Sequence, residues 1–407
     1  MRLADLEVIV VGNPPPGFGG RYFIFVKVTT ACGVVGWGEV YAATVGPEAM
    51  RAVIADVFGR HMAGEDPENI ELMFRRAYSA GFSQRPDPTV MGAFSGLEIA
   101  CWDILGKARE RPVHALWGGR MRERLRSYTY LYPDADQDPA TFYNDPDASA
   151  ATAGRLADDG FTAVKFDPAG AYSIHGGRQP SLADLDRSEA FCRAIRAAVG
   201  DRADLLFGTH GQFTTAGAIR LARRIEPWDP LWFEEPVPPD NALEMGRVAA
   251  ATRIPVAAGE RLTTKYEFAA LLRAGGAAIL QPSLGRVGGL LEARKIAALA
   301  EGFNAQVAPH LYAGPIAWAA GVQLAASIPN FLILETIGTG ATGFHAELLD
   351  APLDWDAGCI RVPDRPGLGV EIDEAVARAH PWSGDRLHLE MSPEPPELRG
   401  AEKFGGG

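Results

Sequence analysis

The sequence has few cysteines and no long apolar run. Its four cysteines, Cys32, Cys101, Cys192 and Cys359, form neither a CxxC pair nor the spacing of a disulfide framework. No apolar stretch reaches the roughly 18 residues that span a bilayer. The first residues, MRLADLEVIVVG, lack a basic segment followed by a long apolar one. We therefore expect a cytoplasmic protein in a reducing compartment.

Positive charge is also scarce. The 39 Lys and Arg residues are outnumbered by 51 Asp and Glu residues, which gives a formal net charge of -12. Binding to a phosphate backbone needs a basic stripe, and the sequence has none, which argues against nucleic acid as a partner. A small anionic substrate is not excluded, because a local cation can override the overall charge.

One pattern repeats from about residue 120 to residue 340. A short apolar run ends in polar residues, a loop follows, and an amphipathic helix comes next. Most of the runs are nearly continuous in apolar residues, as expected for strands that are buried on both faces. The eight runs are SYTYLY (127–132), TAVKFDP (162–168), ADLLFGTH (203–210), PLWFEEP (230–236), IPVAAGE (254–260), AAILQP (277–282), AQVAPH (305–310) and FLILE (331–335).

The segments between these runs have helical periodicity. Phe191, Ile195 and Val199 share one helix face, and the apolar stripe that begins at Ala293 ends before Gly302, which we expect to cap that helix. Eight strands that alternate with helices predict a parallel α/β barrel, because parallel strands need crossover helices. A doubly wound parallel sheet is the second interpretation. The even spacing and the absence of a GxGxxG loop favour the barrel.

Residues 1–115 have a different pattern. The strand-like segments 22–30 and 33–40 predict a hairpin, and helices are expected around 47–62 and 94–110. This part of the chain is therefore expected to form a separate α+β lobe. The last five residues, KFGGG, are expected to be disordered.

Polar side chains gather at the carboxyl ends of the predicted strands, where barrels of this kind place their active sites. They would be costly on apolar strands without a shared polar site. Glu234 and Glu260, on adjacent strands, are suited to hold one Mg²⁺ ion, which prefers oxygen ligands. The alternative is that they pair with cations such as Arg261 or Lys265. The polar residues are Lys165, Asp167, Thr209, His210, Glu234, Glu235, Glu260, Ser283, His310 and Glu335.

Two histidines in this group are the natural proton carriers, since imidazole titrates near neutral pH. A lone histidine is more often structural, but His210 and His310 are both expected at the rim of the barrel. Lys165 is expected either to stabilise a substrate anion or to pair with Asp167. Glu335 is expected to hydrogen-bond a substrate oxygen, if it is protonated or acts through a water.

Several motifs, in this order along the chain, resemble those of the enolase superfamily. GVVGWGEV and SGLEIACWDILGK look like its capping domain, and FEEPVP, AAGERL, ILQPSLGRVGG, APHLYAGPIA and RPGLGVEID look like its barrel and C-terminal segment. KFDP and THGQF are most similar to gluconate and galactonate dehydratases of the mandelate racemase/muconate lactonizing enzyme subgroup. The resemblance implies a modified TIM barrel, (β/α)7β, at 119–345. It also implies an oligomer, and an α+β capping domain at 1–118 that the segment 346–407 completes.

The resemblance implies a role for each matched residue. Glu234 and Glu260 match two of three Mg²⁺ ligands, and in the family the metal stabilises the enediolate left when the proton beside a carboxylate is removed. His310 matches the histidine that takes this proton, and His210 matches the acid that protonates the departing hydroxyl. Glu335 matches a glutamate near the substrate carboxylate.

Two positions depart from the family pattern. The family has an acidic metal ligand two positions before the residue that His210 matches, and this chain has Gly208 there. We expect weaker Mg²⁺ binding, with help from Asp167 or His210, because Mg²⁺ gives up its waters reluctantly. The family also has a carboxylate where this chain has Ser283, so His310 is expected to be a weaker base. Asp167 and Ser283 are predicted to bind substrate.

The main hypothesis is a sugar-acid dehydratase, a hydro-lyase for aldonate-type substrates, with Lys165, His210, His310 and Glu335 in catalysis. An isomerase on the same scaffold, such as a sugar-acid or lactone cycloisomerase or epimerase, is the first alternative. A non-catalytic paralogue is the second. Gly208 and Ser283 favour that second alternative, whereas the presence of both histidines and both glutamates opposes it.

Overall fold

The structure is a computed structural model that describes residues 1–41 and 44–395. These residues form two compact units. The first comprises Met1–Ser127, Gly259–Ala269 and Leu280–Leu389, and the second comprises Tyr128–Ala258, Ala270–Ile279 and the segment that begins at Glu390. The domain limits expected from the sequence stay a prediction, and the KFGGG segment (403–407) lies outside the described residues.

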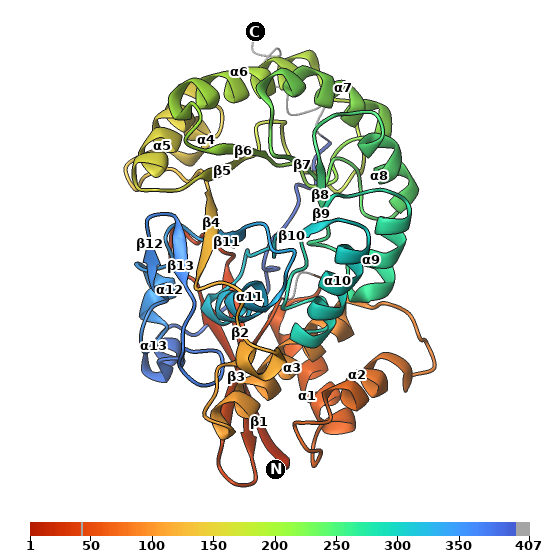
Figure 1. Ribbon diagram of the computed structural model, residues 1–407, viewed down its shortest axis with the longest axis vertical. Helices are drawn as coiled ribbons and strands as arrows, with labels where there is room; N and C mark the ends of the chain where they lie inside the picture. Colours follow the sequence, from red (N-terminus) through yellow and green to blue (C-terminus); the bar gives the residue numbers. More distant parts are fainter. Residues whose placement is uncertain (42–43, 396–407) are drawn as a thin grey trace. The chain divides into compact units, whose positions relative to one another are not determined.

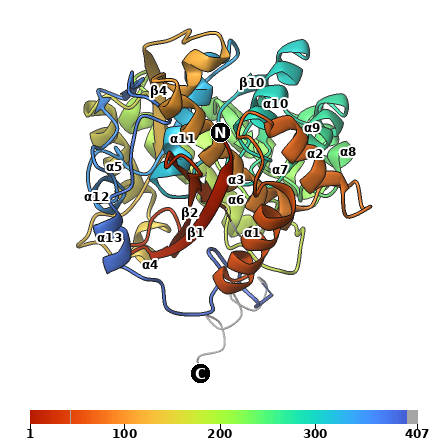
Figure 2. The same cartoon turned by 90° about the horizontal axis from the view of Figure 1, so that it is seen from below.

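An antiparallel sheet of three strands begins the first unit. Its strands, in hydrogen-bonded order, are β1 (Leu3–Gly12), β2 (Tyr22–Thr30) and β3 (Val35–Val40). The predicted hairpin is confirmed, because β2 and β3 pair with Lys27 opposite Trp37. The strand β2 is rich in β-branched and aromatic residues and is buried along most of its length. Figure 2 shows it beside β1.

Helix α3 (Pro88–Ala108) packs closely on β3. Its start is capped by Asp87, whose side chain accepts hydrogen bonds from two backbone N–H groups of the first turn. The close approach requires glycine on both elements, because a Cβ on Gly38 would lie 1.8 Å from the carbonyl oxygen of Gly96. The other helices here, which also pack against α3, are α1 (Pro47–His61) and α2 (Ile70–Ser79).

Two buried glutamates of the first unit cap helices that lie far away in sequence. Glu98 accepts hydrogen bonds of 2.7 and 2.9 Å from backbone N–H groups at the start of α10 (Leu290–Gly302). Glu39 does the same, at 2.9 Å, at the start of α11 (Pro315–Ser327). Both helices have a glycine at the N-cap, which has no side chain for this purpose. Burial raises the pKa of Glu98 and of Glu39 to about 7, against the pull of these hydrogen bonds.

Parallel strands form the core of the second unit. Each neighbouring pair from β4 to β8 is parallel, and Phe166 lies opposite Phe207 where β5 pairs with β6. Figure 1 shows α6, α7 and α8 along one side of β6, β7 and β8. The strands are β4 (Arg124–Tyr130), β5 (Ala163–Phe166), β6 (Asp204–Phe207), β7 (Trp232–Glu234) and β8 (Val256–Ala258), and the helices are α4 (Pro139–Phe142), α5 (Pro146–Asp158), α6 (Leu182–Val199), α7 (Thr215–Ile225) and α8 (Ala242–Ala249).

Strands and helices continue to alternate along the chain. The strands pair in the order β10-β9-β8-β7-β6-β5-β4, and β11 also pairs with β4. This sequential order is typical of a barrel, whereas a doubly wound sheet reverses its order at a switch point. Each of the eight predicted runs overlaps a strand, so the predicted alternation is confirmed. The later elements are α9 (Thr264–Arg273), β9 (Ile279–Leu280), β10 (Gln306–Val307) and β11 (Leu334–Thr336).

One prediction for the helices is wrong by a residue. Gly302 does not cap α10 but is its last helical residue. Asn304 instead adopts the left-handed backbone conformation, with φ at 56°. Asn tolerates this conformation because its short polar side chain can hydrogen-bond locally. In the described parts of the chain, no helix is long and apolar enough to cross a bilayer.

The C-terminal segment returns to the three-stranded sheet of the first unit. Helix α13 (Glu374–Ala379) contacts β1, and Arg378 pairs with Glu7 at 2.7 and 2.9 Å. Lys27 of β2 pairs with Glu374. Helix α13 of the expected segment 346–407 therefore lies against the sheet of the first unit, and the extent of that segment stays a prediction. Shorter elements are α12 (Phe344–Glu347), β12 (Trp355–Asp356), β13 (Cys359–Arg361), which pairs with β4, and the 3₁₀ helices Val113–Trp117 and Glu226–Trp228.

His345 on α12 is a buried histidine within the first unit. Its Nε2 lies 3.1 Å from the carbonyl oxygen of Ala313, and its ring packs at 5.0 Å against the ring of Phe23. Burial lowers the pKa of His345 to about 4. The folded protein therefore holds this imidazole in its neutral form at neutral pH, while the unfolded chain titrates it near the ordinary value of about 6.5.

We expect His345→Gln to make the free energy of unfolding less sensitive to acid. Below pH 6.5 the unfolded state binds a proton at His345 that the folded state does not bind. The free energy of unfolding therefore decreases as the pH is lowered from 6.5 to the folded pKa near 4. At pH 5 the loss from this residue is about 2 kcal/mol. Urea unfolding at pH 7 and pH 5 measures it, with His175→Gln, at an exposed histidine, as the control. Equal pH dependence in wild type and His345→Gln would contradict the prediction.

Candidate active site

Lys165 and Glu234 form a buried ion pair in the second unit. Lys165 lies in β5 and Glu234 ends β7, and the ammonium is 2.6 Å from a carboxylate oxygen, Oε1. The two side chains are 4% and 0% exposed. Lys165 is therefore a cation that pairs with Glu234. The sequence suggested Lys265 as a possible partner, but Lys265 pairs at 3.0 Å with Glu292.

Asp167 and His210 form a second polar pair beside the first. Asp167 follows β5 directly, and its Oδ2 lies 3.2 Å from Nδ1 of His210. The Tyr172 hydroxyl donates a hydrogen bond to the same oxygen, and its ring meets the His210 ring edge-on at 4.7 Å. Burial raises the pKa of Asp167, but the charge and hydrogen bond of His210, with Lys165 and Tyr172, outweigh it and hold the pKa below its ordinary value. Asp167 is therefore ionised.

Hydrogen bonds fix the loop that carries His210. The Thr209 hydroxyl donates to the carbonyl oxygens of Glu234 at 2.5 Å and Glu235 at 2.9 Å, which ties the end of β6 to the end of β7. The backbone N–H of His210 donates to the side chain of Gln212 at 3.0 Å. These hydrogen bonds fix the backbone from which the imidazole of His210 extends.

Glu260 and His310 come together in the first unit. Nε2 of His310 lies 3.5 Å from Oε2 of Glu260, and both side chains are buried. Arg286 donates a hydrogen bond of 3.1 Å to the backbone carbonyl of Glu260. The rings of Tyr41 and His310 meet edge-on, with their centroids 5.7 Å apart. The guanidinium of Arg286 lies over the Tyr41 ring, 4.4 Å from its centroid. These contacts restrict the orientation of the His310 ring.

Ser283 and Glu335 support the segment around His310. Ser283 and His310 form a parallel bridge, so the two residues lie side by side. Oε2 of Glu335 accepts a hydrogen bond of 2.7 Å from the backbone N–H of Leu311. Ser283, His310 and Glu335 are all buried. Glu335 therefore fixes the backbone next to His310.

Sequence reasoning missed four residues of this region. Tyr41, Tyr172 and Arg286 contact predicted site residues, and the ring of His388 packs at 5.0 Å against that of Tyr41. Burial lowers the pKa of His388 to about 3. Tyr41, Tyr172 and Arg286 follow strands in the chain, but this position does not separate them from surface residues, and His388 lies beyond α13, where no such signal exists.

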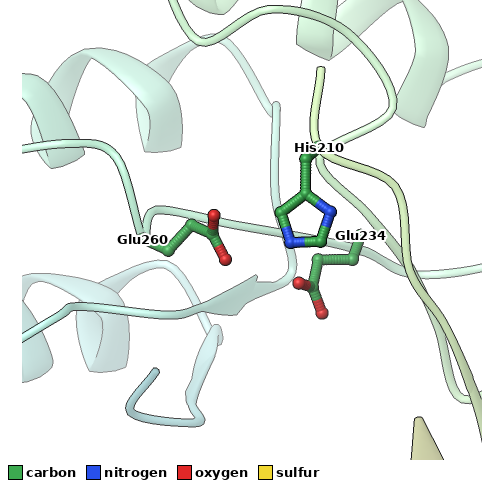
Figure 3. Close-up of side chains that lie close together, drawn as sticks. All are labelled: His210, Glu234 and Glu260. Atoms are coloured by element: carbon green, nitrogen blue, oxygen red, sulfur yellow. The ribbon is translucent and has the colours of Figure 1, made fainter. Parts of the chain in front are cut away.

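The donor atoms present fit a divalent cation. One ligand atom from each of His210 and Glu234, which both belong to the second unit, lies within 4.8 Å of the other, and Figure 3 shows these two side chains close together. Carboxylate oxygens suit Mg²⁺ and Mn²⁺, and imidazole also binds first-row transition metals. Within residues 1–41 and 44–395, Oδ1 of Asp167 is a buried carboxylate oxygen without a hydrogen-bond partner.

Two family models match the chain. The model described as the N-terminal domain of mandelate racemase / muconate lactonizing enzyme matches residues 18–118. The model described as the enolase C-terminal domain-like family matches residues 148–376. The matches cover β2 and β3 of the three-stranded sheet and the parallel strands from β5 onward.

Known proteins are similar along nearly the whole chain. A D-galactonate dehydratase of Ralstonia nicotianae is 36% identical over 371 residues, which covers 87% of this chain and 90% of that protein. A D-xylonate dehydratase of Haloferax volcanii is 33% identical over 406 residues, 95% of each chain. The crystal structure of a mandelate racemase/muconate lactonizing enzyme from a Sulfitobacter species is 64% identical, with a TM-score of 0.95 over 97% of this chain and 99% of that one. The chain has the capping domain and barrel-like domain of the enolase superfamily, and it belongs to the mandelate racemase/muconate lactonizing enzyme family.

Proposed function

We propose that this protein is a dehydratase, a hydro-lyase, that acts on an aldonate-type sugar acid. The observation that carries the proposal is that each of two histidines contacts a carboxylate. Nε2 of His310 lies 3.5 Å from Oε2 of Glu260 in the first unit, and Nδ1 of His210 lies 3.2 Å from Oδ2 of Asp167 in the second unit. The dehydratases named above, which act on D-galactonate and D-xylonate, support the substrate class.

His310 is the proposed base. Its buried imidazole is held by the edge of Tyr41 and by Glu260, which suits a group that takes a proton from a fixed direction. A proton beside a carboxylate is very weakly acidic, so its removal needs concentrated positive charge nearby. Glu234 and Glu260 would hold a Mg²⁺ ion, which when bound supplies this charge as a Lewis acid.

His210 is the proposed acid for the departing hydroxyl. Asp167 contacts Nδ1 of its ring, so Nε2 is the nitrogen left to face the reactant. Lys165 is proposed to stabilise a substrate anion. Its positive charge lies beside Glu234 in the protein interior, and a charge interacts more strongly with an anion there than in water. Ser283 is proposed to bind a substrate hydroxyl, and Glu335 is proposed to position the residues after His310 near the substrate carboxylate.

The proposal includes a Mg²⁺ cofactor, a homo-oligomer and a cytoplasmic location. The support for the location is the small number of scattered cysteines, which remain free thiols in the described residues. Sedimentation of the purified protein measures the oligomeric state.

The test is to incubate the full chain with Mg²⁺ and a panel of sugar acids that includes galactonate, gluconate and xylonate. A dehydratase converts one of them to a 2-keto-3-deoxy acid with the loss of one water, which mass spectrometry and NMR detect. An isomer of the substrate, with no loss of water, would favour the cycloisomerase or epimerase alternative, for which Ser283 in place of a carboxylate is the supporting observation. No reaction with any acid counts against the proposed substrate class.

A further inference from the structure

The last described residues of the chain pair with a loop of the second unit. Ser392 forms a parallel bridge with Ser173, which lies in the loop that follows β5. The backbone N–H of Ser392 donates a hydrogen bond of 3.1 Å to the carbonyl oxygen of Tyr172. The Ser173 hydroxyl donates another, also of 3.1 Å, to the carbonyl oxygen of Glu394. We call residues 390–394, which belong to the second unit like the loop, the strap.

The strap holds the exposed middle of this loop. The two ends of the loop are tied to the segment after β6, because Gln212 donates a side-chain hydrogen bond of 2.9 Å to the carbonyl of Gly170 and accepts one of 3.0 Å, at its own carbonyl, from the N–H of Arg178. Between these ends Ile174 is 64% exposed, and its N–H donates to the carbonyl of Ser392 at 3.1 Å. An exposed loop opens at a low free-energy cost unless such hydrogen bonds hold it.

Tyr172 connects the strapped loop to the polar pair of Asp167 and His210. Its hydroxyl donates a hydrogen bond to Oδ2 of Asp167, the same oxygen that lies 3.2 Å from Nδ1 of His210. Its ring meets the His210 ring edge-on, with the centroids 4.7 Å apart. The backbone of Tyr172 is therefore bound to the strap, and its side chain contacts both members of the pair.

We propose that the strap positions Tyr172 and, through it, the pair of Asp167 and His210 for the acid step of the dehydration. The inference rests on the proposed function, in which His210 protonates the departing hydroxyl. A proton donor acts only within hydrogen-bond reach of its acceptor, and a displacement of about 1 Å can slow a reaction by about 10²-fold. If the strap detaches, Tyr172 moves with its loop, and the His210 ring loses a contact that orients it.

The first test is hydrogen–deuterium exchange of the full chain in Ser392→Pro and Ser392→Ala. Proline lacks the N–H that donates to Tyr172, whereas alanine keeps it, so the two variants form a matched pair. In Ser392→Pro we expect the amide of Ile174 to exchange faster by at least about tenfold, as the loss of one or two hydrogen bonds implies. In Ser392→Ala it should exchange as in the wild type.

The second test observes His210 itself, without any sugar acid. NMR of the imidazole in histidine-labelled protein, assigned with His210→Asn, should show a changed His210 signal in Ser392→Pro. Tyr172→Phe should change it too while Ile174 stays protected, because this variant removes the hydroxyl that binds Asp167 and keeps the strap. Ser392→Ala should leave the signal as it is.

The third test compares two steps of the proposed reaction. In Ser392→Pro and in Tyr172→Phe, formation of the 2-keto-3-deoxy acid should slow by about tenfold or more, while exchange of the substrate α-proton keeps the wild-type rate. A purely structural role of the strap would instead lower both rates together, which would contradict the inference.

Two further results would overturn it. One is wild-type exchange at Ile174 in Ser392→Pro, which would mean that the strap does not hold the loop. The other is an unchanged His210 signal in Ser392→Pro although the loop opens. The proposed function fails in a different way, since the wild type then converts no sugar acid. The exchange and NMR measurements need no substrate, so the two failures are distinguishable.

Discussion

His310→Asn slows exchange of the substrate α-proton with solvent deuterium by at least about 10²-fold, the lower end of what a positioned base contributes. Asn has no basic nitrogen, so it cannot accept the proton. Its amide keeps a polar group in the space near Glu260, which lies 3.5 Å from the native imidazole. The measurement follows the α-proton by NMR in D₂O, with the sugar acid that the panel identifies as substrate.

His210→Asn is the matched control for this experiment. If His210 only protonates the departing hydroxyl, this variant keeps α-proton exchange but forms little or no 2-keto-3-deoxy acid. The two histidine variants therefore give different results in the same pair of assays. Unimpaired exchange in His310→Asn, with both variants folded by circular dichroism, places the base elsewhere in the site.

Lys165→Met lowers the free energy of unfolding of the metal-free protein by about 3 to 5 kcal/mol, the usual result of removing one partner of a buried ion pair. Glu234 is fully buried and its carboxylate lies 2.6 Å from the ammonium, so the variant removes the cation of a buried ion pair and keeps the anion in the interior. Asp167 also loses a cation that holds its pKa down. Met keeps the length of the side chain, so the loss of packing is small. Urea unfolding in EDTA measures the change.

The double variant Lys165→Met with Glu234→Gln tests the cause. Removing both charges should recover a large part of the lost stability, because the buried carboxylate is gone. Arg60→Met, which breaks an ion pair with Asp56 on the surface, is the control and should have little effect. A loss in Lys165→Met no larger than in Arg60→Met would mean that the ion pair contributes nothing to the fold.

Several features could be predicted because they are local in sequence. A short apolar run followed by an amphipathic segment is visible in the chain itself, and each of the eight runs overlaps a strand. Parallel strands of a barrel place their carboxyl ends on one side, and for this reason the sequence predicts that residues such as Glu234 and Glu260 lie at one rim. The hairpin of β2 and β3 was predictable for the same reason, because its strands are joined by a short turn.

Other features depend on residues that are distant in sequence. The ring of Tyr41 contacts His310, and the side chain of Glu98 caps α10. The sequence around these residues contains no pattern that predicts either contact. The Gly302 error has a related cause, since the point at which a helix ends depends on the backbone conformation that Asn304 adopts.

The sequence by itself determined the repeated strands, the acidic and histidine residues at their ends, and the loss of a carboxylate at Gly208, because these are properties of single positions and of their spacing. Only the tertiary structure decided which charges meet. It paired Lys165 with Glu234 and placed Asp167 in the space beside Gly208. The physical reason is that side-chain contacts across parallel strands follow from register and from loop conformation. Both are set by packing over the whole fold rather than by neighbours in the chain.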